Sequence, residues 1–70
     1  MYNNLNAEQA RAHMTNQQVA DYLGMSRVSY ESKKKSGRFI AKECVKLCAL
    51  FSCSFDYLFD SPSVVTMNNQ

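Results

Sequence analysis

The chain has 70 residues, of which 46% are hydrophobic, 11% aromatic and 20% charged, and its formal net charge is +2. This composition is typical of one small folded domain and excludes a disordered polar segment. No stretch reaches the roughly 18 uncharged apolar residues of a membrane span, and the polar start lacks the apolar core of a signal peptide, so we expect a protein that stays inside the cell, outside the membrane.

The first predicted helix covers residues 4–14, where apolar residues recur among strong helix formers. Its apolar positions are Leu5, Ala7, Ala10 and Met14. Its start stays open because three asparagines are possible N-caps, namely Asn3, Asn4 and Asn6.

The second predicted helix has well-marked ends. Thr15 followed by Gln18 matches the capping-box pattern, in which side chains and backbone amides pair reciprocally at a helix start. Gly24 then supplies the left-handed backbone that ends a helix, a conformation that costs other residues roughly 1 kcal/mol or more. The helix is therefore predicted over Asn16–Leu23.

A third helix follows almost at once, because Gly24 and Met25 alone separate the second helix from the next N-cap, Ser26. The third helix is predicted to begin at Arg27 and to lose its signal at Ser36–Gly37. Two helices joined by so tight a turn are typical of DNA-binding units. In these units the first helix crosses the phosphate backbone and the second enters a major groove about 12 Å wide.

A long apolar-periodic segment beginning near Ile40 predicts a fourth helix that reaches about Ser52. The positions that recur at three- and four-residue spacing are Ala41, Cys44, Val45, Cys48 and Phe51. Ser54 can cap a short fifth helix through Phe59, and Pro62 closes the folded part. The sequence thus predicts an all-α domain of five helices over residues 1–61 and a tail over residues 62–70, which either is frayed or joins a partner through its Val64–Val65 pair.

The sequence has few residues suited to catalysis or to metal binding. Three cysteines, Cys44, Cys48 and Cys53, are expected to be reduced, buried thiols, and a metal or redox role is the alternative. His13 is the single histidine, and no third ligand accompanies the two cysteines that are one helical turn apart. Without a glycine-rich phosphate loop either, we expect no enzyme activity, no metal and no cofactor.

Basic charge is concentrated in one region. Residues 27–46 carry seven basic residues against two acidic ones, a net charge of +5, whereas the rest carries one basic residue against four acidic ones, a net charge of −3. The basic residues of the region are Arg27, Lys33, Lys34, Lys35, Arg38, Lys42 and Lys46. A merely solvated surface usually mixes both signs, so this region indicates a polyanionic partner.

One face of the third helix is predicted to read bases. With Tyr30 in the core, a rotation of roughly 100° per residue turns Val28 and Ser32 about 160° away from it and Lys35 about 140° away. Arg27 is the first candidate base reader, because arginine pairs bidentately with guanine, while Val28 can contact a thymine methyl and Ser32 a base or phosphate. Glu31, one turn from both Arg27 and Lys35, either orients them or accepts from a cytosine amine.

Predicted phosphate contacts flank this face and would set affinity and register rather than sequence preference. They are Asn16, Gln17, Lys33, Lys34, Lys35 and Arg38. For the lysine run 33–35, a solvated helix end that complements the helix dipole is an equally good interpretation, and both can hold at once.

Two segments resemble the Cro and cI repressor family, also called the Xre family. Residues 14–30 resemble its helix-turn-helix, and residues 45–59 resemble its closing helices, which end in the pattern Ser-x-Asp-Tyr-Leu-Phe. Together they cover most of residues 4–59 in matching order. The resemblance implies a compact five-helix bundle, the lambda-repressor-like DNA-binding domain of a repressor or Cro-like switch protein, similar to small phage-borne regulators of Gram-positive bacteria.

Within the matching motif, the family's base-reading positions fall on Arg27, Val28 and Ser32. Its backbone-contacting positions fall on Asn16, Ser26 and the loop after the third helix. Three departures stand out: the family favours glutamine at position 16, an acidic residue near position 34, and a serine or threonine cap at position 40, where this chain has Asn16, Lys34 and Ile40.

The expected partner is a double-stranded DNA operator, bound by a homodimer at least on DNA, because one recognition helix reads only a few base pairs. The alternative is an antirepressor, a protein-interaction module that binds a partner repressor through the basic face or the tail. The expected location is the cytoplasm of a bacterium or phage-infected cell.

Overall fold

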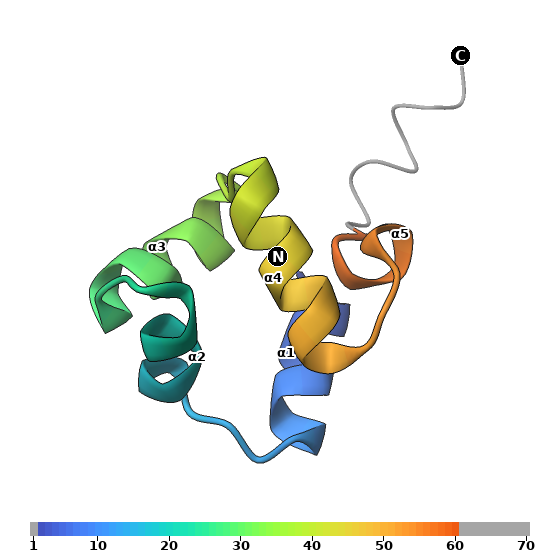
Figure 1. Cartoon of the computed structure of the whole chain (residues 1–70), viewed down its shortest axis with the longest axis horizontal. Helices are drawn as coiled ribbons and strands as arrows, with labels where there is room; N and C mark the ends of the chain where they lie inside the picture. Colours follow the sequence, from blue (N-terminus) through green and yellow to red (C-terminus); the bar gives the residue numbers. More distant parts are fainter. Residues whose placement is uncertain (1, 61–70) are drawn as a thin grey trace.

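The computed structural model describes residues 2–60, which form five α-helices and no strand, so the predicted all-α class is confirmed for this part of the chain (Figure 1). The helices are α1 (Asn3–Arg11), α2 (Asn16–Leu23), α3 (Arg27–Ser36), α4 (Ala41–Phe51) and α5 (Phe55–Leu58). In Figure 1, α2 and α3 lie on one side of α4 and α5 lies on the other. Pro62 and the Val64–Val65 pair lie outside the described residues.

The α2–α3 pair has the predicted bounds, and its caps explain them. The Gln18 amide N–H donates to Thr15 Oγ1 over 3.1 Å, and the Thr15 amide donates back to Gln18 Oε1 over 2.8 Å. At α3, the Ser29 amide donates to Ser26 Oγ over 3.1 Å. Each cap satisfies an amide that a helix start leaves without a partner inside the helix.

Four helix ends use left-handed backbone, and two of them lack glycine. Gly24 and Gly37, both at φ 77°, end α2 and α3, as the sequence indicates for a residue without a Cβ. His13 at φ 57° and Ser52 at φ 54° adopt the same region after α1 and α4. The first helix therefore ends at Arg11, three residues before the predicted end, with the Met14 amide bonded back to the Gln9 carbonyl over 3.1 Å.

Every helix contributes to one small core. Its fully buried side chains are Leu5 of α1, Val19 and Ala20 of α2, Tyr30 of α3, Leu47 of α4 and Leu58 of α5. Partly buried aromatic rings extend the core beside α5, where Phe59 stacks edge-on against the Tyr2 ring with centroids 5.4 Å apart. This core fixes the side of α3 that faces inward and therefore the side that faces solvent.

The apolar stripe of α4 is not a core stripe, which corrects the expectation of buried thiols. Leu47 is the buried residue of α4, whereas Cys44 and Cys48 are half-buried and Val45 is exposed. Cys53 is also half-buried, and all three thiols are free. Partial burial raises the pKa of the Cys44 and Cys48 thiols, which keeps them protonated near neutral pH. The single turn of α5 is too short to cover the rest of the stripe.

Candidate functional site

The outer face of α3, defined here as Val28, Ser32 and Lys35, points to solvent. Val28 is 66% exposed, and Ser32 and Lys35 are exposed, whereas Tyr30 on the opposite side of the helix is fully buried. Val28 lies in the first turn of α3, where its exposed apolar side chain is flanked by polar residues. This surface has the composition needed to contact base edges, which include both hydrogen-bonding groups and a methyl group.

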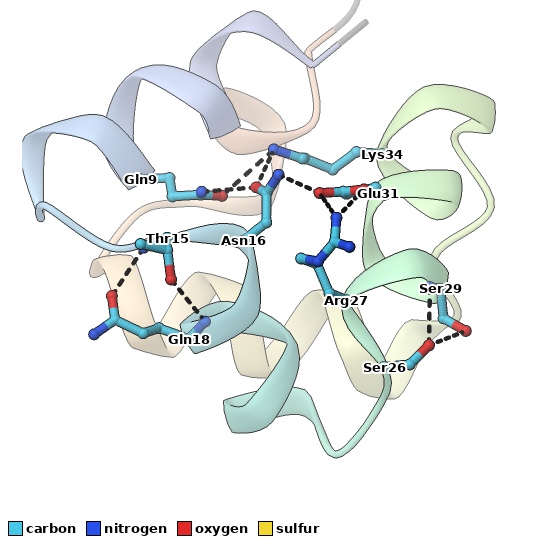
Figure 2. Close-up of polar contacts among 9 residues, drawn as sticks. All are labelled: Gln9, Thr15, Asn16, Gln18, Ser26, Arg27, Ser29, Glu31 and Lys34. Carbon is cyan, nitrogen blue, oxygen red and sulfur yellow. Dashed lines mark hydrogen bonds and ion pairs between the residues drawn. The ribbon is translucent and has the colours of Figure 1, made fainter.

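Beside this face, a partly buried polar network holds the first three helices together (Figure 2). Gln9 of α1 is 8% exposed and accepts a hydrogen bond from the Tyr30 hydroxyl over 2.7 Å. The Gln9 amide nitrogen donates to the Met14 carbonyl over 3.1 Å and to Asn16 Oδ1 over 2.9 Å. Burial raises the pKa of Tyr30, so its hydroxyl stays protonated and keeps donating.

Asn16 carries the network from α2 to the predicted base readers on α3. Its Nδ2 donates to Glu31 Oε2 over 2.8 Å, and both Glu31 oxygens accept from Arg27 Nη1 over 3.0 Å (Figure 2). The Arg27 Nε and Nη2 groups have no acceptor within residues 2–60. Arg27 is thus tethered at one nitrogen and keeps the remaining donors of its planar fork available for an external acceptor.

Lys34 turns toward the protein rather than toward solvent. Its ammonium donates to Asn6 Oδ1 over 2.8 Å and to Asn16 Oδ1 over 3.1 Å, and it lies 5.0 Å from the centroid of the Tyr30 ring. Desolvation lowers the pKa of Lys34, and the nearby Glu31 carboxylate partly opposes that shift. The chain thus places a cation among amide oxygens at this point of α3.

Of the other predicted phosphate contacts, two have side chains that interact within the protein and two have side chains without such a partner in residues 2–60. Lys33 forms an ion pair with Glu43 of α4 over 3.0 Å, and Gln17 donates to Asp21 over 2.8 Å. Lys35 and Arg38 are exposed and have no hydrogen-bond or ion-pair partner in the described part of the chain. These two cations can meet an anion without giving up an interaction inside the protein.

The N-terminus of α2 lies close to the network through Asn16. The Thr15 side chain caps the Gln18 amide, and the backbone amides of Asn16 and Gln17 find no acceptor among residues 2–60. Unpaired amides of a first helical turn point along the helix axis and favour a negative charge. The structure therefore brings free amides, Asn16 and the Arg27–Glu31 pair to neighbouring parts of the α2–α3 unit.

Sequence reasoning missed the residues that position the site, above all Gln9. Gln9 lies one helical turn after the buried Leu5, and this i, i+4 spacing was the one signal that could have placed it on the inner face of α1. Glu43 was also missed. Besides pairing with Lys33, it accepts from the Ile40 amide over 3.1 Å, which starts α4 although the Ile40 side chain cannot cap it.

Acid should weaken the hydrogen bonds by which Glu31 joins Arg27 to Asn16. The hydrogen bond from Asn16, followed by that from Arg27, lowers the pKa of Glu31 below its ordinary value of 4.5. A carboxylate whose pKa is lower in the folded state contributes stability above its unfolded pKa and loses it as the pH falls through the folded pKa. We therefore expect the melting temperature to fall as the pH drops below about 4.5, and Glu31→Gln to weaken this dependence. Thermal melts of both proteins between pH 6 and about 3 measure it, and equal slopes would contradict it.

Residues 2–60 contain no group of three or more side chains suited to hold a metal ion, and none of their helices has the length and apolar run needed to cross a membrane. The class that these observations define is a small all-α domain of five helices. Comparison with known proteins found no matching family model, no similar curated protein and no similar solved structure.

Proposed function

We propose that this chain is a sequence-specific, double-stranded DNA-binding regulator of transcription, of the Cro and cI repressor kind. Its α2–α3 pair would act as a helix-turn-helix, with α3 in the major groove of an operator half-site. The observation that carries the proposal is the exposed outer face of α3, which lies beside Arg27, whose guanidinium is oriented by an ion pair with Glu31. A rigid helix with outward-facing contacts is what direct readout of base edges requires.

The proposed base contacts are those of Arg27, Val28, Ser32 and Glu31. Arg27 would pair with guanine through its free donors while Glu31 holds Nη1, and Val28 would pack on a thymine methyl. Glu31 is engaged by both Arg27 and Asn16, so its orienting role is better supported than direct acceptance from a cytosine amine.

The proposed phosphate contacts start with Lys35 and Arg38, because neither has a partner within residues 2–60. Further contacts to the DNA phosphates would come from two helix starts. These are the backbone amides of Asn16 and Gln17 at the start of α2 and the Ser26 hydroxyl at the start of α3. Lys33 and Lys34 would first have to exchange partners, since Lys33 pairs with Glu43 and Lys34 with two asparagines. We expect these two lysines to contribute less.

A selection experiment tests the proposal. The purified chain is mixed with duplexes that contain a randomised segment, bound duplexes are recovered and amplified, and the enriched sequences are compared over several rounds. We expect a short recurring motif, and an affinity for it at least about a thousandfold above that for random duplex at the same salt concentration. Enrichment of no motif, with equal affinity for all duplexes, would contradict a regulator that reads sequence and would favour the protein-interaction module.

A further inference from the structure

The Lys34 ammonium group lies where α1, α2 and α3 meet, and side chains of all three helices surround it (Figure 2). Besides its hydrogen bonds to Asn6 and Asn16 and its position over the Tyr30 ring, it makes a longer contact of 3.5 Å with Gln9 Oε1. An ammonium group has three protons and accepts no hydrogen bond, so three amide oxygens use its whole donor capacity. Lys34 is therefore bound inside the protein before any DNA phosphate approaches.

The Asn16 amide has one orientation that satisfies all of its neighbours. Its oxygen accepts from Lys34 Nζ, a group that can only donate, and from Gln9 Nε2. Gln9 presents its nitrogen here because the same nitrogen donates to the Met14 carbonyl, which can only accept. On the other side, Asn16 Nδ2 donates to the ionised Glu31 carboxylate, which can also only accept. The direction of these hydrogen bonds is thus fixed by groups whose donor or acceptor character does not change.

This direction reaches Arg27 through Glu31. The Glu31 carboxylate accepts from Asn16 at Oε2 and from Arg27 Nη1 at both oxygens. The hydrogen bond from Asn16 lowers the pKa of Glu31 more than the Lys34 charge does directly. Of the two ways in which Lys34 can act on this carboxylate, the one through the Asn16 amide is therefore the stronger.

We propose that Lys34 is a positioning residue for Arg27. By holding the Asn16 oxygen, Lys34 turns the Asn16 nitrogen toward Glu31. Glu31 then holds one nitrogen of the Arg27 guanidinium and leaves its other donors open. A bidentate pair with guanine needs this planar group in a narrow range of directions, so a firmly held arginine discriminates better between bases. The effect on base preference rests on the proposed function, and Lys34 exerts it without touching DNA.

A direct phosphate contact is the other role open to Lys34, and the two roles give opposite results. A phosphate contact strengthens binding to every duplex and adds about one released counterion to the salt dependence. A positioning residue strengthens binding to the preferred sequence alone. Lys35 is the matched example of the first role, because it is the next residue of α3, is exposed and has no side-chain partner within residues 2–60.

The effect of Lys34 on Glu31 is measured on the protein without DNA. The Glu31 carboxyl group is titrated by NMR in the unaltered chain, Lys34→Met, Lys34→Arg and Lys35→Met, with circular dichroism as the check of folding. Both lysines lie about one helical turn after Glu31, so Lys35→Met controls for the loss of one charge. We expect Lys34→Met to raise the pKa of Glu31 clearly more than Lys35→Met does, and Lys34→Arg, which keeps its donors, to leave it nearly unchanged. Equal rises in the two methionine variants would overturn the proposal.

The route through Asn16 has its own control. In an Asn16→Ala background, Lys34→Met and Lys35→Met should raise the pKa of Glu31 equally, because only the loss of charge then remains. A difference between them that persists in this background would overturn the assignment of Asn16 as the link.

A double-mutant cycle tests the consequence for base reading. The affinities for the selected duplex and for random duplex are measured by fluorescence anisotropy for Lys34→Met, Arg27→Ala and the double variant. We expect Lys34→Met to lower the ratio of these two affinities at least about threefold, and to lower it no further once Arg27 is alanine. Lys34→Arg should keep the ratio. An equal loss for both duplexes, with or without Arg27, would assign Lys34 to phosphate and overturn the positioning role.

The two sets of measurements separate this inference from the proposed function. If selection yields no motif, the proposed regulator is wrong, and the titration of Glu31 still decides whether Lys34 positions the carboxylate that holds Arg27. If selection yields a motif but Lys34→Met changes neither the affinity ratio nor the pKa of Glu31 beyond the effect of Lys35→Met, the DNA binding stands and the positioning role is overturned.

Discussion

Arg27→Ala is expected to weaken binding to the selected duplex by about 1–3 kcal/mol while leaving the affinity for random duplex nearly unchanged. The reason is that a bidentate arginine–guanine pair is made with one base and not with the others. The fork of Arg27 is preorganised by Glu31, which accepts two hydrogen bonds of 3.0 Å from Nη1 and leaves the other donors open. Fluorescence-anisotropy titrations with both duplexes at one fixed salt concentration measure the two affinities.

Lys35→Ala is the matched control, because Lys35 is exposed on the same helix but is assigned to phosphate. It should weaken binding to both duplexes alike and reduce the slope of log affinity against log salt by about one. If Arg27→Ala also weakens both duplexes equally, Arg27 is a backbone contact and its assignment as base reader is wrong.

The second large effect concerns stability. Gln9→Met should destabilise the fold by roughly 1–3 kcal/mol, because it leaves the buried Tyr30 hydroxyl without its acceptor in a site closed to water. Tyr30→Phe should cost about 1–2 kcal/mol for the converse reason, since the Gln9 carbonyl oxygen keeps only a 3.5 Å contact with Lys34. The double variant should cost clearly less than the sum, because it leaves neither the Tyr30 hydroxyl nor the Gln9 carbonyl oxygen without its partner.

The free energy of unfolding is measured by urea titration for the two single variants, the double variant and the unaltered chain, which is the reference. Tyr22→Phe serves as the control for loss of a tyrosine hydroxyl, because Tyr22 is exposed and should respond by less than about 0.5 kcal/mol. Strictly additive effects of Gln9→Met and Tyr30→Phe would show that the network transmits no coupling between α1 and α3.

Local chemistry in the sequence determined where the helices begin and end. Thr15 with Gln18, Ser26 and Gly24 each act within a few residues of themselves, so the bounds of α2 and α3 could be predicted without knowledge of the rest of the chain. The outward direction of Val28 and Ser32 also followed from helical rotation once Tyr30 was placed in the core. The end of α1 depends on His13, a residue type with a low preference for left-handed backbone. There the predicted helix end was three residues too late.

What the tertiary structure decided is which side chains meet. Gln9 of α1 precedes Tyr30 by 21 residues and Lys34 by 25, and no local pattern states that α1 and α3 pack at a distance suited to hydrogen bonds. The exposure of Val45 was hidden for the same reason: periodicity shows that α4 has an apolar side, but the amount of that side that is covered depends on the short α5 that packs against it. Capping acts between neighbours in sequence, whereas burial and partnering depend on how whole helices are arranged.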